Sequence, residues 1–369
     1  MKAVILRANQ VLEYVEVPIP VLAADECRVA VRAAGVCSSD VPRAFDSGAY
    51  FYPLIMGHEL AGEVVACGKT ASSRFRAGDR VVVFPLIPCG KCAACASRNY
   101  ARCVSYDYYG SRRHGGFAEY LNVRDWNLLR LPDGLSFEDA ALVEPVAVVV
   151  HALDKAGLLR QDSVHQRRDI AILGAGFLGL NAVQILRMLC PQVSVTLIDR
   201  NDYKLQVGAR AGAAVEHLAD EQAWGAYIEA NRGRFPVILE ASGVPHTFRM
   251  SLELAEPGGT VVWMGNISDS LELPQKLVSS VLRKELHILG TWNSTYQGDG
   301  PSDWLTTLEL MRRGLRPSAL VSHQIGLEGV AETMGKLYAH KRRRERHDIL
   351  KVLVKPDIGA SGEPVKADE

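Results

Sequence analysis

The sequence predicts an α/β protein made of two parts, a β-rich region and a doubly wound parallel sheet. Two observations support this prediction. Short Val-rich segments bounded by Gly and Pro fill the first 150 residues, whereas strand-like and helix-like segments alternate after residue 169. Such alternation is typical of a parallel sheet that helices cover on both faces. With 369 residues, the chain is long enough for two domains with separate cores.

The β-rich domain is expected over residues 1–150 and includes a cysteine-containing lobe at 85–110. Its strands are predicted at residues 27–33, 63–66 and 79–84. A helix at residues 140–157 should lead out of this domain, with Pro145 either bending it or beginning a turn within it.

The parallel sheet is expected within residues 151–290. Apolar segments rich in Val and Ile predict its strands, at residues 170–173, 193–198, 237–241, 260–264 and 286–289. From residue 291 to residue 355 the chain is expected to return to the first domain. Residues 356–369 combine Gly, Pro and charged side chains, which predicts a disordered tail.

The composition argues against several classes of protein. The formal net charge is zero, whereas proteins that bind nucleic acid depend on an excess of basic residues. No apolar run is long enough for a signal peptide or a transmembrane helix, so no membrane partner is expected. Cysteines spaced for metal binding are consistent with a reducing compartment, and we expect a cytoplasmic protein.

Four of the eight cysteines fall within fifteen residues, as Cys89-x2-Cys92-x2-Cys95-x7-Cys103. Thiolates separated by two residues can converge from one tight turn, and a short loop can add the fourth ligand of a tetrahedral zinc ion. Two disulfides, or four unrelated core cysteines, are the alternatives. Four thiolates leave no coordination position open, so this predicted zinc site is structural and the chemistry lies elsewhere.

A dinucleotide site is predicted where the segment GAGFLG follows an apolar strand and opens a helix. Its glycines permit a tight turn and a close approach to a pyrophosphate, which the helix N-terminus attracts. An aspartate twenty residues beyond the last glycine favours NAD, because its carboxylate would repel a 2′-phosphate. The arginine beside it keeps NADP as the alternative. The predicted contacts are Gly174, Gly176, Phe177, Leu178, Gly179, Asp199 and Arg200.

A second metal site is predicted from residues far apart in the sequence. His58 and Glu59 do not form a metalloprotease helix, because the residue four after His58 is glycine. Together with Cys37 and Glu144, they offer mixed ligands, as in catalytic zinc sites that keep one position open for water or substrate.

The combination of these motifs resembles the zinc-dependent medium-chain alcohol and polyol dehydrogenases. Cys37, the pattern Gly57-His58-Glu59-x2-Gly62-x5-Gly68, the four-cysteine lobe and the dinucleotide motif carry the resemblance, which covers nearly the whole chain. It implies a GroES-like catalytic domain, an inserted Rossmann domain, and two zinc ions per chain with NAD.

The resemblance also implies roles for single residues. Cys37 and His58 are expected to bind the catalytic zinc, and Glu59 or Glu144 to complete the site; the sequence leaves open which glutamate binds directly. Ser39 matches the position of a hydroxyl that relays the substrate proton. Many relatives continue that relay with a histidine, but Pro42 stands at its position here and cannot carry a proton.

The substrate is expected to be a polyol or a polyol phosphate. The segments CSSDVPRAF, AYFYPLIMGHE, YDYYGSRRHGGFAEY and VLRKELHILGTW are similar to those of family members that oxidise galactitol 1-phosphate. Arginine suits phosphate oxygens, so Arg43, Arg112 and Arg113 are candidate phosphate contacts, with exposed loop charges as the alternative. Sorbitol, xylitol or a threonine-type hydroxy amino acid are the alternative substrates.

A non-catalytic dinucleotide-binding or lens-type protein is the alternative from a different class. Such relatives usually lack the catalytic zinc ligands, whereas Cys37, His58 and Glu144 are all present. By analogy with the family, we expect a homodimer or homotetramer that pairs through the edge strand near residues 286–289.

Overall fold

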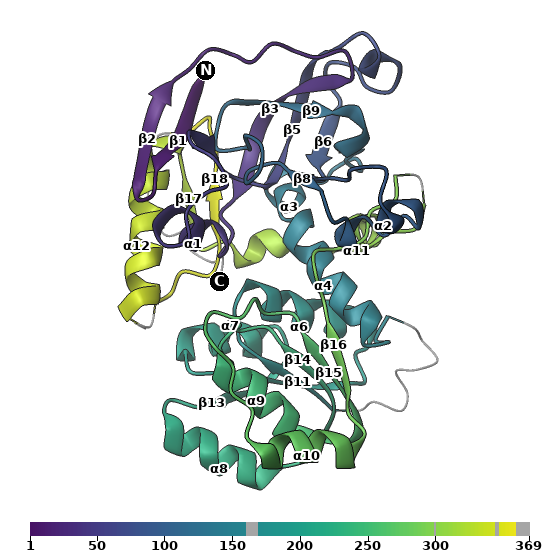
Figure 1. The fold of residues 1–369 in the computed structure, drawn as a ribbon, viewed down its shortest axis with the longest axis vertical. Coiled ribbons are helices and arrows are strands. Elements are labelled where there is room, and N and C mark those ends of the chain that lie inside the picture. Colours follow the sequence, from purple (N-terminus) through teal and green to yellow (C-terminus); the bar gives the residue numbers. More distant parts are fainter. Residues whose placement is uncertain (160–168, 299, 344–346, 359–369) are drawn as a thin grey trace. The chain divides into compact units, whose positions relative to one another are not determined.

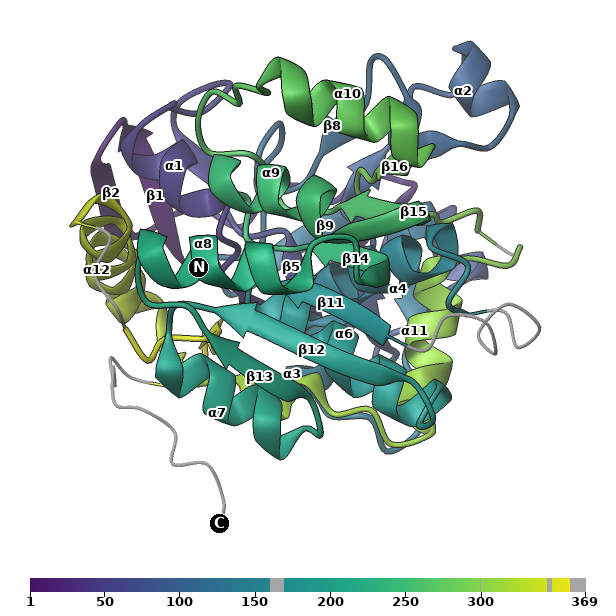
Figure 2. The same ribbon diagram turned by 90° about the horizontal axis from the view of Figure 1, so that it is seen from below.

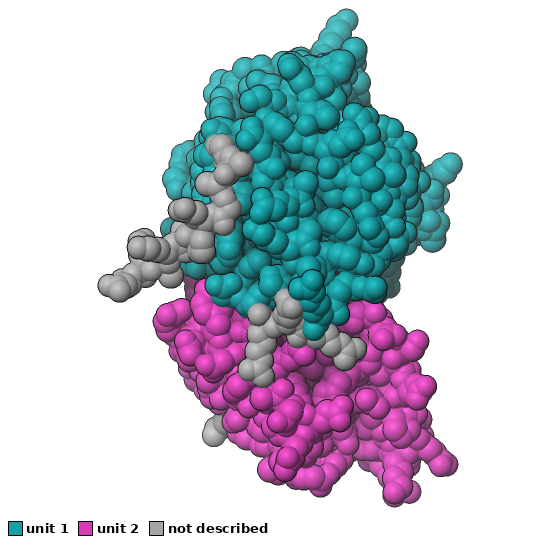
Figure 3. All heavy atoms as spheres, turned by 90° about the vertical axis from the view of Figure 1, so that its left-hand side faces the viewer, with its two compact units in different colours: residues 1–145, 295–369 teal, residues 146–294 magenta. Residues whose placement is uncertain are grey.

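The computed structural model describes residues 1–159, 169–298, 300–343 and 347–358, and it divides the chain into two compact units (Figure 3). Unit 1 comprises Met1–Pro145 and Thr295–Glu369, and unit 2 comprises Val146–Ser294. The unit boundaries therefore lie within a few residues of positions 150 and 290. Residues 359–369 of the predicted tail lie outside the described residues, so its disorder stays a prediction.

A seven-stranded sheet forms the centre of unit 1 (Figure 1). Its strand order is β10-β6-β5-β3-β18-β17, and β9 also pairs with β3. The strands are β3 (Glu26–Gly35), β5 (Glu59–Cys67), β6 (Arg80–Val83), β9 (Tyr120–Arg124), β10 (Leu128–Arg130), β17 (His323–Ile325) and β18 (Val352–Val354). Since β18 pairs with the end of β3, the returning chain completes the sheet that the first part of the chain began.

Smaller elements surround this sheet. A three-stranded sheet contains β1 (Lys2–Ala8), β2 (Val11–Glu16) and β4 (Leu54–Ile55), and the lobe contains the pair β7 (Leu86–Ile87) and β8 (Asp107–Tyr108). The helices are α1 (Asp40–Phe45), α2 (Ala93–Ala96), α3 (Phe137–Ala141), α11 (Asp303–Arg312) and α12 (Val330–Arg343). Short 3-10 helices are η1 (Ala71–Ser73), η2 (Tyr100–Arg102), η3 (Asp125–Asn127), η4 (Pro317–Leu320) and η5 (Leu327–Gly329).

Unit 2 is a six-stranded sheet in which every pairing is parallel, with strand order β13-β12-β11-β14-β15-β16. The strands are β11 (Asp169–Leu173), β12 (Ser194–Asp199), β13 (Ala214–His217), β14 (Phe235–Glu240), β15 (Ala255–Trp263) and β16 (His287–Gly290). This is the order 3-2-1-4-5-6 of dinucleotide-binding sheets, whose ligands bind where the order reverses, between β11 and β14. The predicted fold class is therefore confirmed.

Helices cover both faces of this sheet (Figure 2). α6 (Phe177–Leu189) and α7 (Asp202–Arg210) contact each other and β12, whereas α8 (Glu221–Asn231), α9 (Pro245–Leu254) and α10 (Gln275–Lys284) form the other group. Within the described part of the chain, no helix has both the length and the apolar character required to cross a membrane.

Two details of the sequence prediction were wrong. β13 was not predicted, because its residues lack the run of apolar side chains that marks the other strands. The single helix predicted at residues 140–157 is instead the end of α3 followed by α4 (Val143–Lys155). Pro145 lies in the first turn of α4, where its missing N–H breaks no helical hydrogen bond.

Candidate metal and cofactor sites

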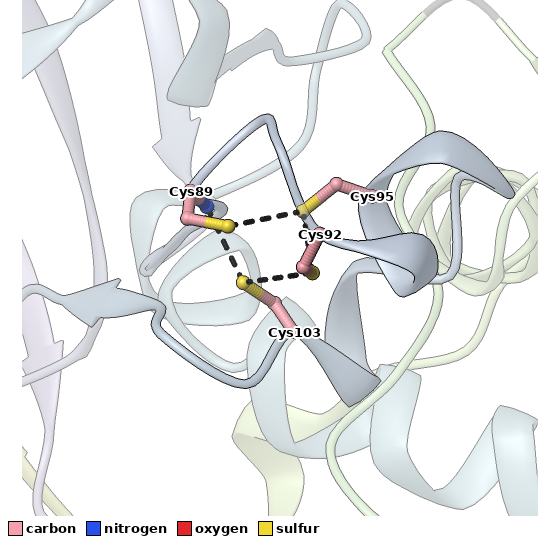
Figure 4. Close-up of side chains that lie close together, drawn as sticks. All are labelled: Cys89, Cys92, Cys95 and Cys103. Atoms are coloured by element: carbon pink, nitrogen blue, oxygen red, sulfur yellow. Dashed lines mark hydrogen bonds between the residues drawn. The ribbon is translucent and has the colours of Figure 1, made fainter.

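The four cysteines of the lobe lie close together (Figure 4). The Sγ–Sγ distance is 3.5 Å between Cys92 and Cys95, and 3.9 Å for both Cys89–Cys95 and Cys92–Cys103. Zinc–sulfur bonds of about 2.3 Å give a tetrahedron with edges of about 3.8 Å. The spacing therefore fits one zinc ion, whereas a disulfide needs sulfur atoms about 2.05 Å apart.

Backbone N–H groups stabilise negative charge in this cluster. The N–H of Cys89 donates to Cys103 Sγ at 3.3 Å. N–H groups of Val104 and Cys95 lower the pKa of the Cys92 thiol to about 6, whereas burial raises that of Cys95 to about 12. A divalent cation would stabilise the thiolate form of all four crowded cysteines, including the one that burial disfavours.

A second cluster lies where β3 ends and β5 begins. The two strands are antiparallel and Gly35 is opposite Glu59, so the residues after β3 lie beside those that start β5. This register brings one ligand atom each of Cys37, His58 and Glu59 within 4.8 Å of one another. A Cβ atom on Gly35 would lie 2.0 Å from Glu59 Oε2, so glycine is needed here to make room for the carboxylate.

Asp40 orients both a cysteine and a histidine of this cluster. It is the first residue of α1, and its Oδ2 accepts a hydrogen bond of 3.1 Å from the backbone N–H of Cys37. Its Oδ1 lies 3.4 Å from His58 Nδ1, which leaves Nε2 of His58 for a metal ion. A carboxylate on the second nitrogen is the usual partner of a metal-binding histidine.

The two glutamates differ in their surroundings. Glu59 is fully buried, its Oε2 lies 2.5 Å from Lys351 Nζ, and no hydrogen-bond donor among the described residues reaches its Oε1. Lys351 also donates to the carbonyl of Val36 at 3.0 Å. Glu144 lies on α4, outside the cluster of three, and its Oε1 accepts from the hydroxyl of Tyr108 at 3.2 Å.

The electrostatic surroundings favour a cation at this site. Burial would lower the pKa of the His58 imidazole, but Asp40 and Cys37 raise it well above its usual value. Burial raises the pKa of Glu144 to about 7; the His58 charge opposes this rise and the Glu59 carboxylate adds to it. Negative groups that stabilise a charged imidazole also stabilise a divalent ion, and Glu59 Oε1 offers it an unpartnered oxygen. The residues present therefore fit zinc.

Ser39 lies beside the same cluster, since its hydroxyl donates to Cys37 Sγ at 3.3 Å. Pro42, three residues further, is the second residue after Asp40 in α1. Its ring has no group that could accept or donate a proton.

The glycine-rich loop of unit 2 has the shape expected of a dinucleotide site. Gly174 has a φ of +109°, and a Cβ on Gly179 would lie 2.0 Å from the carbonyl oxygen of Gly174. Nothing lies within 4 Å of the position a Cβ would take on Gly176, so this side of the loop has room for a phosphate. Phe177 and Leu178 begin α6, whose N-cap Gly176 supplies no side-chain cap. A phosphate can take the place of that cap.

Asp199 is the last residue of β12 and supports the loop directly. Its Oδ2 accepts from the N–H of Ala175 at 2.7 Å, and its Oδ1 accepts from the N–H of Asn201 at 2.8 Å. Arg200 follows it, and burial lowers the pKa of the nearby Lys204 despite the opposing charge of Asp199. A carboxylate and two basic side chains thus share the end of β12, which leaves both NAD and NADP chemically reasonable.

The three arginines proposed to contact phosphate have different surroundings. Arg113 forms an ion pair with Asp107. Arg43 lies on α1; burial would raise the pKa of the Asp40 carboxyl, but His58 and, to a smaller extent, Arg43 lower it. Arg112 contacts the rings of Tyr50 and Tyr106.

Sequence reasoning missed three residues beside the second cluster. Asp40 could have been found, because it follows Cys37 by only three residues. Tyr108 and Lys351 could not, because their distances along the chain from Glu144 and Glu59 give no sign of contact. The pairing of β18 with β3 brings Lys351 there.

Comparison with known proteins identifies the family of the chain. Residues 23–133 match the family model of the alcohol dehydrogenase GroES-like domain, and residues 178–313 match that of the zinc-binding dehydrogenases. Galactitol 1-phosphate 5-dehydrogenase of Escherichia coli K12 is 34% identical over 339 residues, which cover 90% of this chain and 95% of that protein. A crystal structure of the galactitol-1-phosphate dehydrogenase of E. coli has a TM-score of 0.84 at 32% identity, covering 96% of this chain and all of that one.

Two other relatives are named for a different substrate or cofactor. Sorbitol dehydrogenase of Bacillus subtilis is 29% identical over 367 residues, covering 97% of this chain and 98% of that protein. A Sinorhizobium meliloti 1021 structure, named as a zinc-binding dehydrogenase bound to NADP, has a TM-score of 0.84 at 27% identity. It covers 96% of this chain and 99% of that one.

Proposed function

The chain belongs to the zinc-dependent medium-chain dehydrogenase family, and from this premise we propose that it oxidises a secondary alcohol of a polyol phosphate. Galactitol 1-phosphate is the favoured substrate and NAD the favoured acceptor. The observation that carries the proposal is the cluster of Cys37, His58 and Glu59, in a chain that also has a dinucleotide-binding sheet.

The residues of unit 1 supply a mixed ligand set. Cys37, His58 and Glu59 hold the catalytic zinc in this proposal, and Glu144 is the acid that can exchange with Glu59. When bound, zinc acts as a Lewis acid that lowers the pKa of a substrate hydroxyl, and the nicotinamide accepts the hydride. Asp40 holds the imidazole of His58 in place, and Lys351 holds the carboxylate of Glu59.

The proton that the substrate loses needs an acceptor. The hydroxyl of Ser39 lies at the cluster, because it contacts Cys37 Sγ, so it is the proposed first member of the proton route. Pro42 cannot be the next member. We therefore propose that water takes the proton from Ser39.

The four cysteines of the lobe hold a second zinc ion in this proposal. Since four thiolates complete a tetrahedron, this ion contacts no substrate and stabilises the lobe.

The cofactor assignment depends on the end of β12. Asp199 favours NAD, since its carboxylate repels a 2′-phosphate, whereas Arg200 and Lys204 would attract one. The E. coli relative named for galactitol 1-phosphate supports the phosphorylated substrate, and the B. subtilis relative named for sorbitol supports the alternative of a neutral polyol.

A rate panel tests the proposal. The zinc-loaded protein is assayed with galactitol 1-phosphate, galactitol, sorbitol, xylitol and L-threonine, each with NAD and with NADP. We expect the highest kcat/KM for galactitol 1-phosphate with NAD, and two zinc ions per chain. A higher kcat/KM for a neutral polyol or for threonine would identify that compound, and not galactitol 1-phosphate, as the substrate. If neither NAD nor NADP is reduced with any of these compounds, the proposal is overturned.

Two expectations about the whole protein belong to the same proposal. We propose a cytoplasmic homodimer or homotetramer that binds neither nucleic acid nor a membrane. β16 supports the oligomer, because it is an edge strand of the unit 2 sheet and Ile288 on it is partly exposed. Light scattering of the purified protein measures the oligomeric state.

A further inference from the structure

Arg112 is an exposed arginine held by aromatic rings. Its guanidinium carbon lies 4.3 Å from the centre of the Tyr50 ring and 4.5 Å from that of Tyr106. Such contacts with ring faces hold a guanidinium group in place while its N–H donors stay available at the group's edge. Within the described part of the chain, neither a hydrogen bond nor an ion pair engages the Arg112 side chain.

Arg112 is also tied to the second metal cluster. Its backbone N–H donates to the carbonyl oxygen of Tyr108 at 2.9 Å. The hydroxyl of Tyr108 donates to Glu144, and the ring of Tyr108 lies 5.7 Å from that of His58. The ring of Tyr106, which contacts Arg112, in turn lies 6.1 Å from the ring of Tyr108. A short chain of contacts therefore joins Arg112 to two residues of the candidate active site.

The other two arginines are less available at the surface. Arg113 pairs with Asp107; burial would lower the pKa of Arg113, but Asp107 raises it above its usual value. Arg43 is only partly exposed, and its Nε atom is buried without a hydrogen-bond acceptor among the described residues. Of the three candidates, Arg112 alone combines exposure with a side chain that has no acceptor among the described residues.

Carboxylates surround the candidate metal cluster. Those of Asp40, Glu59 and Glu144 lie in or beside it, and Lys351 is paired with Glu59. Apart from a metal ion in the cluster, a substrate phosphate would therefore need a positive side chain from elsewhere to bind it. Arginine offers parallel N–H donors that match two phosphate oxygens.

We propose that Arg112, positioned by Tyr50 and Tyr106, binds the phosphate of the substrate and selects phosphorylated over neutral polyols. This inference rests on the proposed function and names the residue that determines its specificity. Arg43 and Arg113 keep structural roles: Arg43 stabilises the charge of Asp40, and Arg113 fixes the turn after β8.

Steady-state kinetics of Arg112→Ala and Arg112→Lys test this inference, with galactitol 1-phosphate and galactitol as substrates. Arg313→Ala, at another exposed arginine of unit 1, is the matched control. Loss of charge-assisted hydrogen bonds predicts a fall of roughly 10- to 100-fold in kcat/KM for the phosphate ester in Arg112→Ala, mostly through KM. The kcat/KM for galactitol should change less than about threefold, and Arg112→Lys should be intermediate.

A binding measurement accompanies the kinetics. Galactitol 1-phosphate should raise the Tm of the wild-type protein and of Arg313→Ala. At the same concentration it should raise the Tm of Arg112→Ala much less. Equal losses for both substrates in Arg112→Ala, or a sugar acid preferred to the phosphate ester, would overturn the role in phosphate binding while leaving the dehydrogenase intact. A wild-type protein that oxidises no polyol at all refutes the proposed function instead.

Discussion

The two candidate metal clusters of unit 1 are built in opposite ways. The lobe draws four identical ligands from fifteen consecutive residues, and its sulfur atoms are spaced for a closed tetrahedron. The second cluster draws three different candidate ligands from the segments where β3 ends and β5 begins, and a buried aspartate and a buried lysine hold them in place. Local, uniform ligands make a site that stabilises its own loop, whereas a site for chemistry depends on the whole sheet.

Because of this difference, substitutions in the two clusters should affect different properties of the protein. Changes in the lobe should affect stability and leave the turnover of folded protein nearly unchanged. Changes in the second cluster should affect turnover and leave stability nearly unchanged.

His58→Ala should have the largest effect. It removes a proposed ligand of the catalytic zinc, so kcat/KM should fall at least about 1,000-fold because the charge stabilisation supplied by the metal would be lost. Metal analysis should find one zinc ion per chain instead of two, and the Tm should change by only a few degrees. If the variant keeps both zinc ions and its activity, His58 is not a ligand of the catalytic zinc.

Asp40→Asn should have the next largest effect. The amide cannot supply the negative charge that orients the His58 imidazole, so activity or zinc affinity should fall by about 10- to 100-fold. Zinc affinity is measured by competition with a chelator, and Asp46→Asn is the control at an aspartate that follows α1. Equal zinc affinity and activity in Asp40→Asn and wild type would contradict the role of Asp40.

Glu144→Gln distinguishes the two glutamates. Because Glu59 lies in the cluster and Glu144 outside it, Glu144→Gln should lower kcat/KM by no more than about tenfold. It should keep two zinc ions, since glutamine can still accept the Tyr108 hydrogen bond. Glu59→Gln should lower activity further and lose one zinc ion. The reverse order would make Glu144 the direct ligand.

Cys95→Ala should have the smallest effect on turnover. The lobe loses a zinc ligand, so the Tm should fall by several degrees and one zinc ion should be lost. The kcat/KM per folded, zinc-containing active site should change less than about threefold. Cys190→Ala, at a buried cysteine outside both clusters, is the matched control. If Cys95→Ala is as stable as Cys190→Ala, the lobe holds no structural metal.

The sequence predicted the lobe and the glycine-rich loop more completely than the second cluster. Both depend on residues close together in the chain, so spacing alone indicates their geometry. Cys37 and His58 were found through a family pattern, but Asp40 and Lys351 were not. Lys351 reaches Glu59 only because β18 pairs with β3, and no local signal reports a pairing over more than 300 residues.

The strands of the unit 2 sheet show the same limit of prediction from local sequence signals. Five strands were predicted from their apolar runs, and four of them are mostly buried, whereas the edge strand β16 is mostly exposed. β13 is a short edge strand whose position depends on its neighbour β12 rather than on its own residues. Arg112 was a candidate from the sequence, but only its contacts with Tyr50 and Tyr106 separate it from Arg43 and Arg113.

The pairing of β18 with β3 also sets the order in which the protein can mature on the ribosome. Unit 2 is continuous in sequence and can fold as soon as residue 294 has left the exit tunnel. Unit 1 must wait for residues 351–354, which supply Lys351 to Glu59 and a strand to the central sheet. During synthesis the nascent chain therefore acquires its parallel sheet before its candidate reaction centre, and residues 351–354, which are translated after all of unit 2, make that centre complete.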